Sequence, residues 1–358
     1  MDQRGFIFTG QDGWNKLGYL AELYQAHGIF ILTDENTKAH CLPVVLQKCE
    51  GLKDAKLICL APGEENKTVD AANRLWIELS NQGALKKSLL ICLGGGVITD
   101  LGGFVAATFK RGMDYIQLPT SLLAMVDASI GGKTALNLDG LKNQIGLITV
   151  AKGVFIFTEF LSTLPERHLT SGFAEMIKHA LISDRVHYHE LLQCNLLKDA
   201  DADKLILHSA SIKVGVVEGD PHEMGRRRIL NFGHTIGHAL EAYSLQHDPQ
   251  PLLHGEAVAA GLVCEAFISM RTLGLSENDL QSIANFVTWH FPHYRLKPSA
   301  CNDIIALMLK DKKIDSPGKI NFSLLQSIGK PVIDQYPGEK LIRESMHFYV
   351  NIEFGFFS

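Results

Sequence analysis

Several features that would assign a chain to a special class of protein are absent from this sequence of 358 residues. Positive and negative side chains nearly balance, with a formal net charge of -5 at pH 7, so no global field attracts nucleic acid or an anionic membrane. The longest apolar runs stop short of the roughly 18 residues that a membrane span needs, and there is no internal repeat. We therefore expect no nucleic-acid or membrane partner, and any anionic ligand must be held by a local cluster of Lys and Arg.

The 7 cysteines do not indicate a disulfide framework, because they form no Cys-x-x-Cys pair and their number is odd. Most lie in apolar runs, as Cys59 and Cys92 do, which is typical of buried thiols in a reducing compartment. The first ten residues show no basic region followed by an apolar segment, so we expect no signal peptide and a cytoplasmic protein. The length suffices for two domains with a sizeable core.

In the first half, continuous apolar runs alternate with helical patterns. The runs occupy residues 28–33, 56–61, 88–93 and 115–118, and the helical patterns end near Cys49 or span residues 68–79 and 101–108. Runs that are apolar throughout indicate parallel strands covered on both faces, which predicts a Rossmann-like α/β domain. Ligands of such sheets bind at the carboxyl ends of the strands, where the glycine-rich and polar segments lie.

The glycine-rich segment Gly94–Asp100 (GGGVITD) follows the third of these runs. Its glycines allow the backbone to approach a bulky anion, and the start of the next helix favours a pyrophosphate. Asp34 and Asp100 are placed to accept hydrogen bonds from ribose or nicotinamide. The segment does not have the G-x-G-x-x-G spacing, so a tight strand-to-helix turn is the alternative.

A second glycine-rich segment, Gly131–Thr134 (GGKT), resembles a P-loop only superficially. The G-x-x-x-x-G-K-[ST] spacing fails because residue 127 is Asp. The residues predict a lysine, Lys133, held near Asp127 and suited to a phosphate or a carboxylate. Lys142 and Asn143 follow shortly. An exposed turn is the alternative.

From about residue 160 the pattern becomes mainly helical, and its most unusual part is residues 227–238 (RRILNFGHTIGH). On one helix, Arg227, Asn231, His234 and His238 would fall within an arc of roughly 60°, opposite an apolar face. We predict such a helix, presenting one cation, one amide and two imidazoles. A solvated face is the alternative, although such faces favour Lys and Glu over His and Asn.

Another predicted helix, capped by Thr170 or Ser171, carries Glu175 and Lys178 one turn apart. Their apolar neighbours favour a partly buried site over an exposed surface ion pair.

His254 begins a further helix, and the preceding proline-containing loop can bring it back to His234. Two imidazoles and the carboxylate of Glu175 would leave an open position on a metal ion, as in catalytic zinc sites. Chance clustering is the alternative, since the chain has 15 His. His234 and His238 lack the glutamate of an HExxH site.

Taken together, these segments resemble the 3-dehydroquinate synthase family of sugar-phosphate cyclases. The matching runs follow the family's order and cover most of the chain: residues 62–67, 94–104, 118–137, 142–146, 160–180, 211–220, 227–241, 254–262 and 311–313. The resemblance implies a lyase that converts 3-deoxy-D-arabino-heptulosonate 7-phosphate to 3-dehydroquinate and phosphate in the shikimate pathway. The implied route is transient NAD-dependent oxidation, phosphate elimination, reduction and intramolecular aldol closure.

The resemblance also implies the roles of individual residues. The metal ligands, normally for Zn²⁺ (or Co²⁺), are Glu175, His234 and His254. The positions that line NAD+ are Asp34, Asn36, Glu64, Lys67, Gly95, Gly96, Val97, Asp100, Thr120, Ser121, Lys133, Lys142, Phe160, Leu161, Ser162 and Thr163. The substrate and catalytic positions are Asp127, Lys133, Lys142, Asn143, Lys178, Lys213, Arg227, Asn231, His238 and either Lys312 or Lys313, with Lys312 preferred.

We therefore expect an NAD-binding α/β domain over residues 1–159 and a mainly helical metal- and substrate-binding domain over residues 160–358. The resemblance implies a sugar-phosphate substrate and a homodimer. Three alternatives remain: a sister cyclase, a metal-dependent NAD polyol dehydrogenase, and a non-catalytic protein of the same fold. The cations Lys133, Lys178, Lys213 and Arg227 argue against the dehydrogenase, because a polyol carries no phosphate or carboxylate to neutralise.

Overall fold

The computed structural model describes residues 6–139, 141–194, 201–309 and 319–352. It divides into two compact units, one of residues 1–169 with Lys213–Glu218 and one of Thr170–Ile212 with residues 219–358. Each unit is described by itself. The boundary expected after residue 159 stays a prediction, and Lys312 and Lys313 lie outside the described residues.

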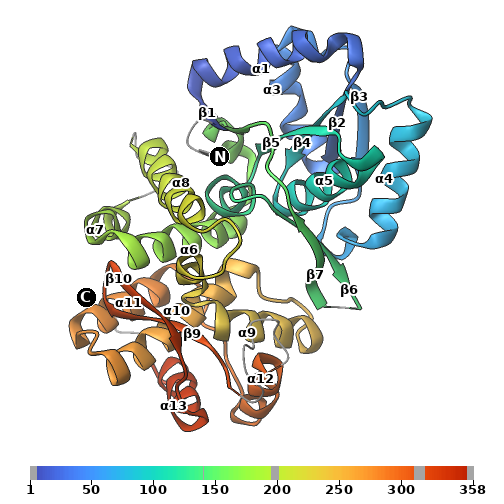
Figure 1. The fold of residues 1–358 in the computed structure, drawn as a ribbon. Coiled ribbons are helices and arrows are strands. Elements are labelled where there is room, and N and C mark those ends of the chain that lie inside the picture. The colour runs from blue at the N-terminus through green and yellow to red at the C-terminus, as the bar shows by residue number, and fades with distance from the viewer. Residues whose placement is uncertain (1–5, 140, 195–200, 310–318, 353–358) are drawn as a thin grey trace. The chain divides into compact units, whose positions relative to one another are not determined.

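The first unit is built on a parallel sheet of six strands in the order β1-β8-β5-β4-β2-β3 (Figure 1). The predicted parallel sheet is confirmed, since every pairing within it is parallel. The four apolar runs of the sequence form the strands β2 to β5, whereas β1 and β8, of three residues each, were not predicted. The strands are β1 (Ile7–Thr9), β2 (Ile29–Asp34), β3 (Lys56–Leu60), β4 (Leu89–Gly94), β5 (Asp114–Pro119) and β8 (Val154–Ile156).

The helices of this unit are α1 (Gly10–Tyr24), α2 (Glu35–His40), α3 (Leu42–Lys48), α4 (Val69–Asn81) and α5 (Gly96–Thr108). α5 packs closely on the sheet because Gly102 faces Cys92, where a Cβ atom would collide with the Cys92 thiol. Phe30 and Leu101 belong to the same buried core. Cys59 is exposed, so the expectation of a buried thiol is wrong there, because β3 is an edge strand.

A two-stranded antiparallel hairpin of β6 (Lys133–Leu138) and β7 (Leu141–Ile148) extends the unit. It carries Lys133, Lys142 and Asn143. The sequence did not predict this hairpin, although β7 ends in the apolar residues Ile145, Leu147 and Ile148; where it is described, β7 is half-exposed to exposed.

The second unit is mainly helical, as predicted, around the buried helix α10. Its helices are α6 (Glu166–Ser183), α7 (Arg185–Gln193), α8 (Ala202–Gly219), α9 (His234–His247), α10 (His254–Leu273), α11 (Glu277–His290), α12 (Cys301–Met308) and α13 (Glu339–Val350). α6 and α8 each contribute residues to both units. An antiparallel hairpin of β9 (Phe322–Ser327) and β10 (Lys330–Gln335) was not predicted. Among the described residues, none of the helices combines the length and the apolar character needed to cross a membrane.

The predicted cap of the helix that carries Glu175 is wrong. α6 begins at Glu166, directly after Pro165, so Thr170 and Ser171 lie inside it. Proline suits this place because it fixes a helix-compatible φ angle and gives up an N–H that the start of a helix would leave unpaired. The Ser171 hydroxyl instead accepts a hydrogen bond from the Gly255 N–H at 2.9 Å, which attaches the start of α10 to α6.

An ion pair between Arg185 and Asp279 joins α7 to α11. Both guanidinium N–H groups of Arg185 donate to Asp279, at 2.9 and 2.8 Å, and the pKa of Asp279 is lowered chiefly by this contact. A lowered folded-state pKa stabilises the protein above the unfolded-state pKa of about 3.9, and this stabilisation is lost as the pH falls through the folded-state value. Arg185 is half-exposed, so we expect Asp279→Asn to lower the free energy of unfolding by about 0.5–1 kcal/mol at pH 7. Urea unfolding should show the two proteins converging as the pH falls from about 3.9 through the lowered folded-state pKa; an equal difference at acid pH would contradict the ion-pair explanation.

Candidate active site

The segment of residues 227–238 is not the single helix that the sequence predicted. A 3-10 helix spans Arg226–Asn231, and α9 begins only at His234. Gly233 lies between them with φ of 80°, in the left-handed region that glycine adopts without strain. A Cβ atom there would also lie 2.6 Å from a Leu262 methyl group. The polar stripe therefore consists of two parts, with Arg227 and Asn231 before the break and His234 and His238 after it.

Glu175, His234 and His254 come from α6, α9 and α10 and meet at one point. The Nε2 atoms of His234 and His254 each lie 3.3 Å from Glu175 Oε1. Glu175 is completely buried, and its other oxygen contacts the ammonium of Lys178, which is 1% exposed. The expectation of a buried pair over an exposed one therefore holds for Glu175 and Lys178 in this structure.

The tautomer of His234 shows that this cluster fits a cation. His234 Nδ1 lies 3.2 Å from the carbonyl oxygen of Phe232, which can only accept a hydrogen bond. Burial lowers the pKa of His234 to about 3, so the ring is neutral and its single proton is on Nδ1. Its Nε2 lone pair then faces a carboxylate oxygen, which is repulsive unless a positive ion lies between them. Two nitrogen donors and one oxygen donor are the ligands that zinc-type ions prefer.

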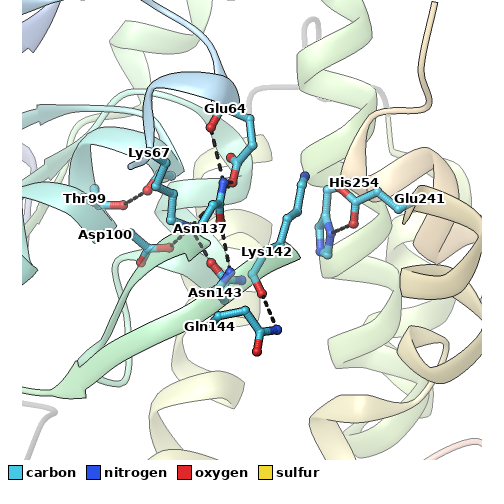
Figure 2. Close-up of polar contacts among 11 residues, drawn as sticks. Glu64, Lys67, Thr99, Asp100, Asn137, Lys142, Asn143, Gln144, Glu241 and His254 are labelled. Carbon is cyan, nitrogen blue, oxygen red and sulfur yellow. Dashed lines mark hydrogen bonds and ion pairs between the residues drawn. The ribbon is translucent and has the colours of Figure 1, made fainter. Parts of the chain in front are cut away.

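Glu241, on α9, orients His254 from the opposite side of the ring. Its Oε2 atom lies 3.2 Å from His254 Nδ1, as Figure 2 shows. Burial lowers the pKa of His254, but Glu241 and Glu175 outweigh burial and raise it to about 10. A carboxylate on the outer nitrogen of a histidine ligand fixes the ring and raises its basicity. Glu241 is thus a positioning residue that the sequence analysis missed, although its spacing of seven from His234 puts both on one face of α9.

We expect Glu241→Gln to weaken metal binding by about 10- to 100-fold, the usual cost of losing such an outer partner. The amide keeps the shape of the side chain but loses the charge that supports His254. Competition with a zinc-selective chelator measures the change. Unaltered affinity would remove Glu241 from the site, and Glu277→Gln, at the exposed start of α11, is the matched control.

The remaining predicted substrate residues of the second unit lie near the break before α9. Arg227 is 1% exposed, and its guanidinium donates to the carbonyl of Pro221 at 2.7 Å. Asn231 donates to Glu223 at 3.3 Å. His238 joins the imidazole group, since one nitrogen each of His234, His238 and His254 lie within 4.8 Å of one another. The structure therefore offers two donor sets, one with Glu175 and one with His238.

In the first unit, the segment Gly94–Asp100 joins β4 to α5. Gly95 occupies the cap position of α5, and no side chain caps this helix start. Uncapped N–H groups and the helix dipole together suit a phosphate, so the segment fits a dinucleotide. Thr120 is buried, and its N–H donates to the Gly94 carbonyl at 3.0 Å. Ser121 lies beside the same turn, with its hydroxyl 3.3 Å from the place of a Cβ atom on Gly95.

Lys67 is the centre of a polar network beside this turn (Figure 2). Its buried ammonium donates to Asp100 and to Asn143, both at 2.6 Å, and lies 3.8 Å from Glu64. Burial raises the pKa of Asp100 although Lys67 opposes the shift. The network brings together residues from three separate segments that the resemblance assigned to NAD+ or substrate.

Asn137, on β6, was missed and completes this network. Its side chain accepts from the Asn143 N–H at 2.9 Å and donates to Glu64 Oε1 at 2.9 Å. Asn143 has a positive φ of 55°, a conformation that asparagine tolerates better than most residues. No spacing rule indicated Asn137, because the hairpin itself was not predicted.

The other predicted residues of the first unit lie on several elements. Asp34 caps α2 by accepting from the Thr37 N–H at 2.8 Å, and Asn36 is exposed in the first turn. Lys213 contacts Asp127 Oδ1 at 2.8 Å. Lys133 is exposed and Lys142 half-buried on the hairpin, Val97 is in the first turn of α5 after Gly96, and Phe160, Leu161, Ser162 and Thr163 form the 3-10 helix Thr158–Thr163.

The architecture assigns the chain to a broad class first. Over 96% of both chains it superposes on a crystal structure of 2-deoxy-scyllo-inosose synthase complexed with carbaglucose-6-phosphate, NAD+ and Co²⁺, with a TM-score of 0.80 and 23% identity. Over 97% of both chains it also superposes on an iron-containing alcohol dehydrogenase, with a TM-score of 0.67 and 14% identity. The fold is thus that of sugar-phosphate cyclases and metal-dependent dehydrogenases.

Sequence comparison identifies one family within this class. The chain matches the model of the 3-dehydroquinate synthase N-terminal region over residues 57–171 and that of the C-terminal region over residues 172–314. It is 41% identical to 3-dehydroquinate synthase of Parabacteroides distasonis over 90% of this chain and 91% of the relative. It is 39% identical to that of Pyrococcus abyssi over 92% of this chain and 96% of the relative. The chain belongs to the 3-dehydroquinate synthase family.

Proposed function

We propose that the chain is a lyase that converts 3-deoxy-D-arabino-heptulosonate 7-phosphate to 3-dehydroquinate and phosphate, a step of aromatic amino acid biosynthesis. The observation that carries the proposal is the convergence of Glu175, His234 and His254, in a chain that is 41% identical to a 3-dehydroquinate synthase over 323 residues.

The reaction needs two bound groups, and the described residues fit both. NAD+ would supply reversible hydride transfer, and we place it at the uncapped start of α5 and the Lys67 network. A zinc-type ion, held by Glu175, His234 and His254, would polarise the oxygen of the hydroxyl that is oxidised. Oxidation next to the C–H bond that must break makes its proton acidic enough to leave.

The cations of the chain would bind the substrate, which carries a carboxylate and a phosphate. Lys178 places a buried positive charge beside Glu175, and the planar guanidinium of Arg227 suits a bidentate contact with an oxyanion. Asn231 and His238 would donate hydrogen bonds to the phosphate oxygens. We further propose that Lys133, Lys142, Asn143 and Lys213 bind substrate.

The fold also occurs in an iron-containing alcohol dehydrogenase, so a polyol dehydrogenase is the alternative. A polyol dehydrogenase transfers a hydride to NAD+ permanently, whereas the proposed enzyme returns it in every turnover. Nothing in a neutral polyol would use the cations Lys178 and Arg227. A sister cyclase would release phosphate from a substrate that lacks the carboxylate.

Phosphate release and NADH absorbance, measured together, distinguish these reactions. With NAD+, Zn²⁺ and the heptulosonate phosphate, we expect stoichiometric release of phosphate, a carbocyclic product and no accumulation of NADH. NADH that accumulates with glycerol would replace the proposal by a dehydrogenase. Turnover of glucose 6-phosphate without turnover of the heptulosonate would replace it by a sister cyclase.

We also propose that the enzyme acts in the cytoplasm as a homodimer. The free state of all 7 cysteines supports a reducing compartment. The dimer rests on the family resemblance alone, and light scattering of the purified protein tests it; a mass of one chain, about 39.5 kDa, would contradict it.

A further inference from the structure

A second cluster of imidazole and carboxylate groups, which the proposed function does not use, lies between α7 and α8 in the second unit. One nitrogen each of His187 and His208 and one oxygen of Glu190 lie within 4.8 Å of one another. His187 and Glu190 are three residues apart on α7 and share a face, with Nδ1 of the histidine 3.5 Å from Oε2 of the glutamate. The ring centroids of the two histidines are 4.2 Å apart. Three borderline donors therefore converge at this point.

His187 is the buried member of this cluster. Its side chain is 0% exposed, and its Nε2 lies 2.8 Å from the Ser209 hydroxyl. Its Nδ1 is also buried and faces the Glu190 carboxylate at 3.5 Å, which is too long for a good hydrogen bond. A metal ion at this point would bind the lone pair of Nδ1 and the Glu190 carboxylate together.

Asp184 supports the cluster from the start of α7. Its Oδ1 accepts from the N–H groups of Val186 and His187, at 2.8 and 3.2 Å, and so caps the helix. Its Oδ2 lies 3.4 Å from His208 Nε2. A carboxylate beside one ring nitrogen fixes the orientation of a histidine whose other nitrogen binds a metal. The side chains of Glu190 and His208 are 50% and 40% exposed, so an ion can enter from solvent.

We propose that His187, Glu190 and His208 form a second metal site, which binds a divalent ion of the zinc type. Two imidazoles and one carboxylate suit zinc and its neighbours in the transition series, whereas magnesium and calcium prefer oxygen donors alone. Three protein ligands leave a fourth position for water. Because the ligands come from two helices, the bound ion joins α7 to α8 and stabilises the folded state by mass action.

Equilibrium dialysis against Zn²⁺ in the presence of NAD+ tests the proposal on the whole protein. We expect two equivalents of zinc per chain, one after His208→Asn, one after Glu190→Gln, and two after the control His189→Asn. His189 is exposed on α7 and does not belong to the cluster. The pair His208→Asn and His254→Ala distinguishes the two sites, since each removes one equivalent and the double variant removes both.

Thermal unfolding supplies a readout that does not depend on turnover. In the His254→Ala background we expect added Zn²⁺ to raise Tm by a few degrees, and His208→Asn to abolish that increase. One equivalent in the unaltered protein, lost on His254→Ala, would overturn the second site and leave the proposed function intact. Two equivalents that persist in both His208→Asn and Glu190→Gln would likewise overturn it. If the unaltered protein shows no turnover while His208→Asn still loses one equivalent of zinc, the proposed function is contradicted and the second metal site stands.

Discussion

Replacing His254 by alanine is expected to remove the catalytic zinc and to lower turnover by at least about 10³-fold. Its Nε2 lies 3.3 Å from Glu175 Oε1, and alanine leaves Glu175 and His234 as the only members of the proposed ligand set. A bound ion contributes several kcal/mol of charge stabilisation, and each 1.36 kcal/mol is a factor of ten in rate. Metal analysis and phosphate release on the same preparation measure both effects.

Two further variants make this result specific. His247→Ala, at the exposed end of α9, should retain both zinc and activity. His238→Asn decides between the two donor sets, because the structure groups His238 with His234 and His254 as closely as a metal site requires. We expect it to retain zinc and to lose turnover, as a substrate residue would. Loss of zinc from His238→Asn, with full zinc in Glu175→Gln, would replace Glu175 by His238 in the ligand set.

The parts of the fold that the sequence predicted best are those with a strong local signal. β2 to β5 are continuous apolar runs, and a buried parallel sheet leaves that pattern whatever the chain does elsewhere. The proline-containing loop before α10 predicted its start at His254 correctly. β1 and β8 have only three residues each, too few for a pattern to emerge.

The error in residues 227–238 has a different cause. Spacings of four, three and four fit a helix, but Phe232 has a non-helical ψ of 127° and Gly233 has a left-handed conformation. That conformation is set by tertiary packing, because Gly233 lies against Leu262 of α10, 29 residues further along the chain. Local periodicity contains no information about such a contact. His234 and His238 lie one turn apart on α9, as predicted, because both follow the break.

Residues that position others were the hardest to foresee. Asn137 and Glu265 act by accepting hydrogen bonds from backbone N–H groups, and nothing in their own neighbourhood in the sequence indicates this. Family resemblance names residues that touch ligands, whereas the structure adds those that hold them. Glu265 has the largest expected effect among these.

Glu265 of α10 takes the place of a cap for α9. No side chain caps α9 at Gly233, but the two oxygens of Glu265 accept from the N–H groups of Gly233 and Ile236, at 2.7 and 3.0 Å. The carboxylate is 0% exposed, so no water can replace it. It also compensates the positive end of the α9 dipole, next to the first residue of the helix, His234.

Glu265→Ala is therefore expected to lower the free energy of unfolding by about 3–5 kcal/mol, since each buried N–H without a partner costs about 1–3 kcal/mol and the lost side chain leaves a cavity. Glu265→Gln retains one oxygen acceptor and should cost about half as much. Urea unfolding followed by circular dichroism measures both, with Glu277→Ala, at the exposed start of α11, as a control.

The same variants show whether Glu265 serves the metal site as well as the fold. Because α9 begins at His234, a frayed helix start displaces one ligand. Zinc affinity and stability should then both be lowest in Glu265→Ala, intermediate in Glu265→Gln and highest in the unaltered protein. A purely structural role would lower the free energy of unfolding and leave the zinc affinity of the folded fraction unaltered. A Glu265→Ala variant that unfolds at the urea concentration of the unaltered protein would show that α9 does not depend on this carboxylate.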